Sequence, residues 1–230
     1  MSSRAPGRDR TKVIVSTGIP AWMVSAYSSP RLAPYLRHSG GDAVRAVNLY
    51  HWNVMVSAAF YGPLHTFELA LRNSLHSHLS THFEQGDWWD RAPLDSEGQR
   101  LVRQAKARCH RSAGTDDIVT ELSLGFWSSL VARRYDRDLW VPVLHRAFPG
   151  YRGPRRVLQD RLYSLRLLRN RIMHHEPIHH RHLEADHAKL YLVLSYISPE
   201  IASGIKPFDR VPEVLLVKDQ MCRGDLPPSF

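Results

Sequence analysis

A repeating apolar pattern that follows Pro63 is the feature that most constrains the fold. Apolar residues recur at intervals of three or four, the spacing of one buried helix face, at Leu64, Phe67, Leu71, Leu75 and Leu79. Proline suits the first turn of a helix, because its missing N–H would have no intrahelical partner there. We therefore expect a helix to begin at Pro63. The preceding segment predicts another, mostly apolar helix with Asp42 as its start signal.

The same reasoning predicts helices along most of the remaining chain. They are expected over about 95–111, from Asp116 or Asp117, over about 155–175, and over about 181–197. Residues 86–94 look like a loop, and 136–148 should form a short or kinked helix because a proline interrupts them. Only Val214–Val217 is typical of a β-strand, so the sequence predicts an all-α protein with at most a minor hairpin.

The chain divides into three expected parts. Residues 1–12 are polar and basic and should form a flexible tail. Residues 13–205 are long enough to build one helical domain around a single core. Residues 206–230 are expected to form an irregular C-terminal extension, and no internal repeat is visible.

The charge of the chain favours an acidic partner. The formal net charge is +9, from 31 Lys and Arg against 22 Asp and Glu, which indicates nucleic acid as the partner class. An arginine-rich composition imposed by a GC-rich genome is the alternative explanation. Two cysteines without a CxxC pair indicate a reducing compartment. No segment is apolar enough for a membrane span or a signal peptide, so we expect a cytoplasmic protein without a membrane partner.

Two chemistries compete within the stretch LRLLRNRIMHHEPIHHRH. His175-Glu176-Pro177-Ile178-His179 fits the HExxH pattern of zinc proteases, which needs both histidines on one helix face. Pro177 lies inside the pattern, where it would cost about 3 kcal/mol in a helix interior. The helix should therefore end near His175, which argues against the protease. We expect no metal and no cofactor. The alternative is a looser metal site among the six histidines between His174 and His187.

The competing pattern is Arg169-Asn170-x-x-x-His174 on the same predicted helix. Arg169 falls in the middle of an otherwise apolar stripe, so it is either paired internally or faces a cleft between packed helices. Asn170 and His174 are neighbours on one face, whereas Arg169 and His174 lie about 140° apart on an ideal helix. They converge only if the helix end distorts or if two copies of the helix meet.

These residue types suit RNA cleavage without a metal. The 2′-OH of RNA attacks the adjacent phosphate, so an enzyme must move protons and stabilise the pentavalent oxyanion. Histidine titrates near neutrality and can serve as general acid or base. Arginine offers a charged fork to phosphoryl oxygens. The spacing alone is a weak signal, and a packing arginine beside a satisfied histidine is the alternative.

Other residues are candidates to support such a site. A second Arg-Asn pair lies in the Pro63 helix, where Glu68 and Arg72 are spaced to pair and are followed by Asn73 and His76. His175 and Glu176 flank the motif. The candidates for RNA-backbone contact are Arg155, Arg156, Arg166 and Arg171, with Arg152 and Arg161 beside them. A solvated helix face would explain these arginines equally well. Phe126 and Trp127 are expected in the core rather than as a base-stacking platform.

Four sequence blocks carry a resemblance to a known family. They occur in order between about residues 40 and 200 and read NLYHWNVMVSAAFYGPLHTFELALRNSLHSHL, DIVTELSLGFWSSL, YDRDLW and LRLLRNRIMHHEPI. In these blocks the chain resembles the Abi-like proteins of bacterial abortive infection, a branch of the HEPN superfamily.

The resemblance implies a HEPN-like helical bundle with Arg169, Asn170 and His174 as the catalytic motif of a metal-independent ribonuclease. It also implies a homodimer in which two motif helices face each other and RNA is the substrate. Met173 departs from the smaller residue expected before His174. The expectation is thus an antiphage or toxin ribonuclease. A non-catalytic RNA-binding protein of the same fold, or a protein that binds another partner through its dimer interface, is the alternative.

Overall fold

The described part of the protein is entirely helical. The computed structural model describes residues 18–110 and 112–228, and no strand occurs among them. The first helices are α1 (Ala21–Tyr27), α2 (Ser29–His38), α3 (Ala43–Phe83), α4 (Ser96–Arg108), α5 (Thr115–Glu121) and α6 (Leu124–Ser129). They are followed by α7 (Arg155–Met173), α8 (Leu183–Ile197), α9 (Pro199–Gly204), α10 (Val211–Leu216) and α11 (Lys218–Arg223). The expected tail 1–12 lies outside the described residues.

Short segments of tighter or wider helix connect these elements. They are the 3₁₀ helices η2 (Trp88–Asp90), η3 (Arg133–Tyr135), η5 (Leu144–Ala147) and η6 (Lys206–Phe208), and the π-helix η4 (Asp136–Trp140). The segment expected to be short or kinked therefore breaks into η4, a turn and η5. No helix in the described residues is both long and apolar enough to span a bilayer.

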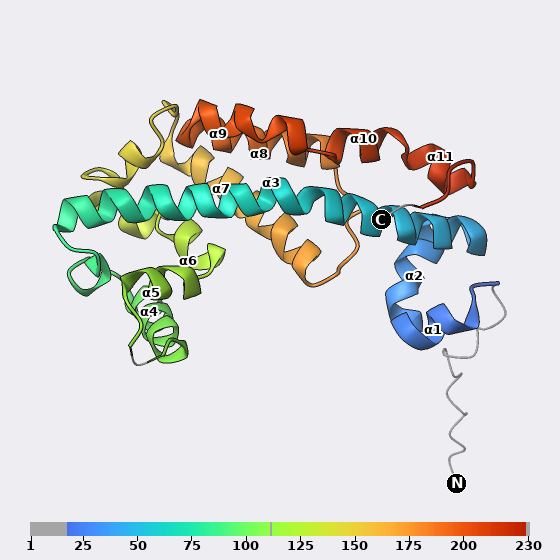
Figure 1. Cartoon of the computed structure of the whole chain (residues 1–230), viewed down its shortest axis with the longest axis horizontal. Coiled ribbons are helices and arrows are strands. Elements are labelled where there is room, and N and C mark those ends of the chain that lie inside the picture. Colours follow the sequence, from blue (N-terminus) through green and yellow to red (C-terminus); the bar gives the residue numbers. More distant parts are fainter. Residues whose placement is uncertain (1–17, 111, 229–230) are drawn as a thin grey trace, which may run out of the picture. The chain divides into compact units, whose positions relative to one another are not determined.

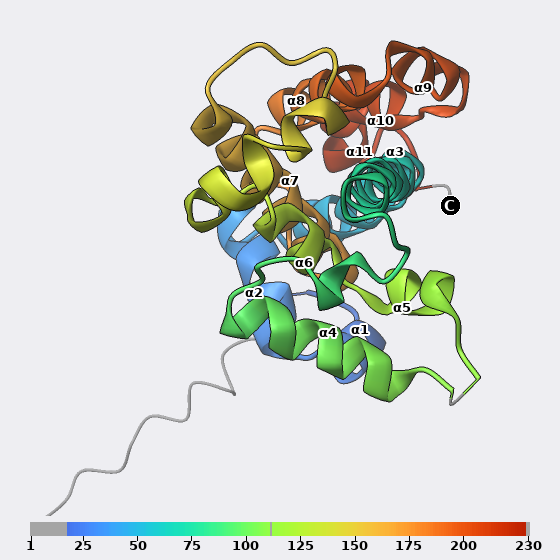
Figure 2. The same ribbon diagram turned by 90° about the vertical axis from the view of Figure 1, so that its left-hand side faces the viewer.

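The chain separates into two compact units. Unit 1 contains residues 18–59, Pro177–Arg181 and residues 210–228, and unit 2 contains Phe60–Glu176 and His182–Asp209. The C-terminal extension expected to be irregular is thus largely helical, and its residues divide between unit 2, up to Asp209, and unit 1, from residue 210. In unit 2, α7 packs on α8 and on α6, and α8 packs on α9 (Figure 1). Figure 2 views α3 nearly end-on and shows α8 and α9 on one side of it and α4 and α5 on another.

The prediction that a new helix begins at Pro63 is wrong. Pro63 lies inside α3, which continues unbroken for 41 residues. Its ring cannot donate to the carbonyl of Ala59, and unit 2 begins at Phe60, immediately after that residue. The predicted stripe from Leu64 to Leu79 is confirmed, because all five of its side chains are fully buried. Burial on both sides of the proline offsets the missing hydrogen bond.

The predicted β-strand at Val214–Val217 is also wrong. Most of this segment belongs to α10, where Val211 and Val214 are buried and Leu216 is exposed. Pro212 occupies the first turn, a position that tolerates its missing N–H. Packing of one helix face overrode the strand preference of valine.

Three tryptophans form part of the core of unit 2. Trp88, Trp89 and Trp127 are buried, and the rings of Trp88 and Trp127 lie 6.1 Å apart between centroids. Phe126 and Trp127 make an edge-to-face pair at 5.3 Å. The expectation that Phe126 and Trp127 belong to the core is confirmed.

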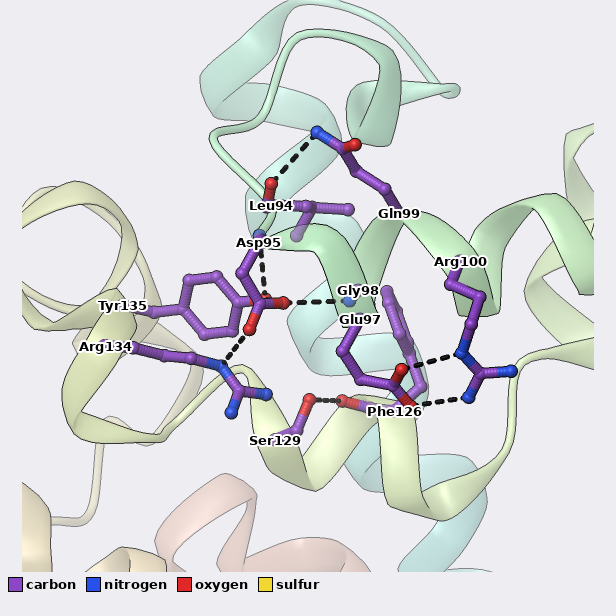
Figure 3. Close-up of polar contacts among 10 residues, drawn as sticks. All are labelled: Leu94, Asp95, Glu97, Gly98, Gln99, Arg100, Phe126, Ser129, Arg134 and Tyr135. Atoms are coloured by element: carbon purple, nitrogen blue, oxygen red, sulfur yellow. Dashed lines mark hydrogen bonds and ion pairs between the residues drawn. The ribbon is translucent and has the colours of Figure 1, made fainter.

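A polar network fixes the start of α4. Asp95 caps the helix by accepting a hydrogen bond from the Gly98 backbone N–H at 2.8 Å (Figure 3). The Tyr135 hydroxyl donates to the same carboxylate at 2.6 Å, and Arg134 Nε lies 2.9 Å from its other oxygen. Burial by itself raises the pKa of Asp95. The hydrogen bonds from Tyr135 and Gly98 and the charge of Arg134 together lower it by more, so the pKa lies below its ordinary value.

We expect Asp95→Ala to lower the free energy of unfolding by about 2 kcal/mol, because it removes a helix cap and a charge-assisted hydrogen bond. Glu97→Ala is the matched control in the same turn. Among the described residues, Glu97 forms an ion pair only with exposed Arg100, so its loss should change stability by less than about 0.5 kcal/mol. Urea unfolding of both variants at neutral pH measures the difference. Equal effects would contradict the role given to Asp95.

Candidate functional site

The helix that carries the motif ends in a left-handed turn. His174 is the C-cap of α7, and His175 follows with φ of 56°, a conformation that residues other than glycine adopt infrequently. The His175 N–H donates to the Ile172 carbonyl at 3.0 Å, and the Glu176 N–H donates to the Arg171 carbonyl at 2.7 Å. These two bonds form a Schellman motif, and Pro177 follows directly, where it cannot continue a helix. The helix predicted to reach His175 therefore ends two residues earlier.

The HExxH pattern does not form the geometry of a zinc protease. His175 is exposed in the left-handed turn, and His179 is buried in the non-helical segment that follows. The two histidines therefore do not share a helix face, as that site requires. Among residues 18–110 and 112–228, no group of three or more His, Cys, Asp or Glu side chains could hold a metal ion.

Arg169 is paired across two helices. Its Nε donates to Glu68 Oε1 at 2.6 Å and its Nη2 donates to Oε2 at 3.2 Å. The guanidinium of α7 and the carboxylate of α3 therefore form a bidentate ion pair. The side chains are 31% and 24% exposed, respectively. The pair explains why an arginine lies on an otherwise apolar stripe. It replaces the i,i+4 pair that the sequence predicted between Glu68 and Arg72.

Asn170 and His174 lie on a different side of α7. His174 is exposed, Asn170 is half-buried, and the His174 backbone N–H donates to the Asn170 carbonyl at 2.9 Å. Within the described part of the chain, no polar contact joins the Arg169 side chain to that of Asn170 or His174. One copy of the chain therefore presents the arginine and the histidine separately, as the angle of about 140° between them predicts.

The other candidates on α3 have their own contacts. Arg72 Nε donates weakly to Asn73 Oδ1 at 3.4 Å. His76 accepts a hydrogen bond from Trp88 Nε1 at 3.1 Å, and its ring lies beside Trp89. Burial lowers the pKa of His76, which keeps its ring in the neutral form that can accept this bond. His76 thus belongs to the tryptophan cluster, about 12 Å along the helix from Glu68.

The candidate arginine track is largely engaged in intramolecular contacts. Arg155 bonds Asp136, Gln159 and the Val131 carbonyl, and its side chain is only 13% exposed. Arg161 contacts the Tyr196 hydroxyl, and Arg152 bonds nearby carbonyls. Arg171 Nη1 lies 3.8 Å from Glu176. Arg156 remains exposed, with Asp160 at 3.9 Å.

Arg166 has a different environment. Its guanidinium lies over the ring of Tyr163, with 5.2 Å between Cζ and the ring centroid. Its Nε is buried and makes no hydrogen bond to the described residues.

Three exposed apolar side chains on α7, those of Val157, Tyr163 and Leu167, were not singled out from the sequence. Tyr163 and Leu167 are 51% and 39% exposed. Spacings of four, three and four residues place Tyr163, Leu167, Asn170 and His174 on one helix face. The signal was present in the sequence, since a helical projection of α7 shows apolar residues opposite the buried stripe as well as within it.

Comparison with protein-family models, with curated proteins and with solved structures finds no match to this chain.

Proposed function

We propose that the protein is a metal-independent ribonuclease of the HEPN type, built on a HEPN-like bundle and acting as an antiphage or toxin effector. The observation that carries the proposal is the Glu68–Arg169 pair, which holds an arginine in a fixed orientation in the helix that ends at His174. Asn170 and His174 lie on the solvent side of the same helix. Histidine can transfer protons and arginine can stabilise charge on phosphoryl oxygens, the two contributions that RNA cleavage without a metal needs.

In the proposed reaction, the 2′ oxygen attacks the neighbouring phosphorus and the bond to the 5′ oxygen breaks. A general base takes the 2′ proton and a general acid gives a proton to the departing 5′ oxygen, with a histidine in one of these two roles, which leaves a 2′,3′-cyclic phosphate and a 5′-hydroxyl. His174 can serve because its side chain is exposed at the end of α7, where a substrate can reach the ring. Arg169 would stabilise the charge on the phosphoryl oxygens, and Asn170 would orient the phosphate or His174.

We infer that the proposed site uses a second copy of the chain. Arg169 and His174 of one copy point to different sides of α7, so a cleft that uses both is best formed by two helices. Exposed Tyr163 and Leu167 lie on the same face as Asn170 and His174 and offer apolar area for that contact. We infer a homodimer in which the α7 helices face each other.

Glu68 sets a condition on substrate binding. Its carboxylate neutralises Arg169 through the Nε and Nη2 positions. A phosphate must therefore bind through the remaining N–H groups of the guanidinium or displace Glu68. In either case, the affinity for phosphate depends on where the Glu68 carboxylate lies relative to Arg169.

The proposal predicts that the purified protein cuts total RNA in the presence of EDTA. The Arg169→Ala variant should cut at least about a hundredfold more slowly, because it lacks the charge that stabilises the transition state. RNA gel electrophoresis with mapping of the 2′,3′-cyclic phosphate ends measures the reaction. Cleavage that EDTA abolishes, or that Arg169→Ala retains in full, would contradict the proposal.

A non-catalytic RNA-binding protein is the second candidate. It is favoured by the engagement of Arg169 with Glu68, which leaves the arginine neutralised in the resting structure. Such a protein would leave RNA intact and bind it with an affinity that falls steeply with salt.

A further inference from the structure

The segment Pro177–Arg181 follows soon after the end of α7 and packs apart from the residues that flank it in the sequence. It packs in unit 1, although the residues on both sides of it belong to unit 2. Ile178 is fully buried, and His179 is only 4% exposed. The Asn53 side-chain oxygen accepts hydrogen bonds from both of their backbone N–H groups, at 2.8 and 3.0 Å. Lys218 Nζ donates to the His179 carbonyl at 3.1 Å. The backbone of the segment is therefore well satisfied.

The side chain of His179, unlike its backbone, lacks hydrogen bonds to the described residues. Both ring nitrogens are buried, and neither makes a hydrogen bond to the described residues. The ring packs against aromatic neighbours instead, at 4.9 Å from Tyr35 and 4.8 Å from His38 between centroids. A polar ring buried without partners costs stability, and a protonated ring in the same place would cost far more.

The groups around His179 oppose a positive charge. His38 faces the ring from α2, His180 adjoins it at 5.4 Å between centroids, and Lys218 reaches its carbonyl from α11. Tyr35 supplies no counter-charge, because burial raises the pKa of its hydroxyl and keeps it neutral. Asn53, the contact from α3, is uncharged. Burial, followed by the charges of His38, His180 and Lys218, lowers the pKa of His179 from 6.5 to about 4.

We propose that Pro177–Arg181 is a proton-sensitive latch, which remains seated in unit 1 while the His179 ring is neutral and leaves when the ring is protonated. The sign follows from linkage. The released histidine takes up a proton near its ordinary pKa of 6.5, and the seated one does so only near pH 4. Acidification therefore favours release, and its effect develops as the pH falls from about 6.5 to about 4. The latch does not depend on whether RNA is the substrate.

Hydrogen exchange of the full-length protein, corrected for the intrinsic effect of pH, tests the latch. The amides of Ile178 and His179 should lose protection on the order of a hundredfold between pH 7 and pH 4. His179→Phe should retain that protection, because its ring cannot be protonated. His182→Gln, which replaces an exposed histidine just beyond the segment, should behave as the wild type does.

Three outcomes would overturn the latch. The first is protection in the wild type that is unchanged at pH 4. The second is protection that His179→Phe, and a second variant that cannot be protonated, His179→Leu, both lose at pH 4 to the same extent as the wild type. The third is an equal loss at Leu49 and Trp52 of α3, which would indicate unfolding of unit 1 rather than local release. Should neither His179 variant fold, NMR titration of the wild-type His179 ring decides. A midpoint far below 6.5 that coincides with amide deprotection supports the latch, and a midpoint near 6.5 overturns it.

Discussion

His174→Ala is expected to reduce RNA cleavage by about a hundredfold to ten-thousandfold, the range that a general acid or base contributes. The stability of the protein should hardly change, because the ring is exposed and the C-cap contact is made by backbone atoms. Single-turnover cleavage of a labelled RNA in EDTA, with circular dichroism as the check on folding, measures both quantities. His182→Ala, which removes another exposed histidine, should cleave as the wild type does.

Two further variants separate chemistry from assembly. Leu167→Glu places a charge on the exposed α7 face without altering the motif. If the proposed dimer forms through this face, the variant should be monomeric and should not cleave RNA. Mixing Arg169→Ala with His174→Ala should restore part of the activity, since a mixed dimer regains one arginine and one histidine in the shared cleft. A His174→Ala protein that cleaves at the wild-type rate would remove the catalytic role of this residue.

Asn53→Ala is expected to lower the free energy of unfolding by about 2 to 6 kcal/mol, because it leaves two buried backbone N–H groups without an acceptor. Asn53 is 5% exposed, so water cannot readily replace the lost oxygen. Urea unfolding at pH 7, monitored by tryptophan fluorescence, reports the change, since Trp52 neighbours Asn53 in α3.

Ser57→Ala is the matched control one helical turn away. The Ser57 hydroxyl donates to the Asn53 carbonyl of its own helix at 2.7 Å and to no other described residue, so its loss should cost less than about 0.5 kcal/mol. A loss below about 1 kcal/mol in Asn53→Ala would contradict the anchoring role of this side chain.

Sequence reasoning succeeded where the determinant was local. The stripe from Leu64 to Leu79 has the period of a helix, and every turn of it is buried. Asp42 was recognised as a start signal, and its side chain accepts the Arg45 N–H at 3.0 Å, as an N-cap should. The break after the motif was expected from Pro177, although the left-handed turn at His175 ends the helix slightly earlier.

Predictions from the sequence were wrong or missing where contacts between distant parts of the chain determine the structure. Pro63 ordinarily marks a helix start, but burial on both sides of it supports one continuous helix. Glu68 was assigned to Arg72 because they are neighbours in one helix, whereas its partner lies 101 residues away on α7. The packing of His179 against Tyr35 and His38 could not be predicted from the sequence, because a local pattern does not indicate which helix a loop will contact.

The sequence by itself determined that the protein is helical and where most of its helices lie, and it gave the candidate residues on which the proposed chemistry rests. These properties follow from periodicity, caps and side-chain chemistry, all of which act over a few residues. Only the tertiary structure decided that Glu68 holds Arg169, that His174 remains exposed, and that Asn53 anchors the segment after the motif. Each of these depends on contacts between residues far apart in the sequence, which form only when the helices pack.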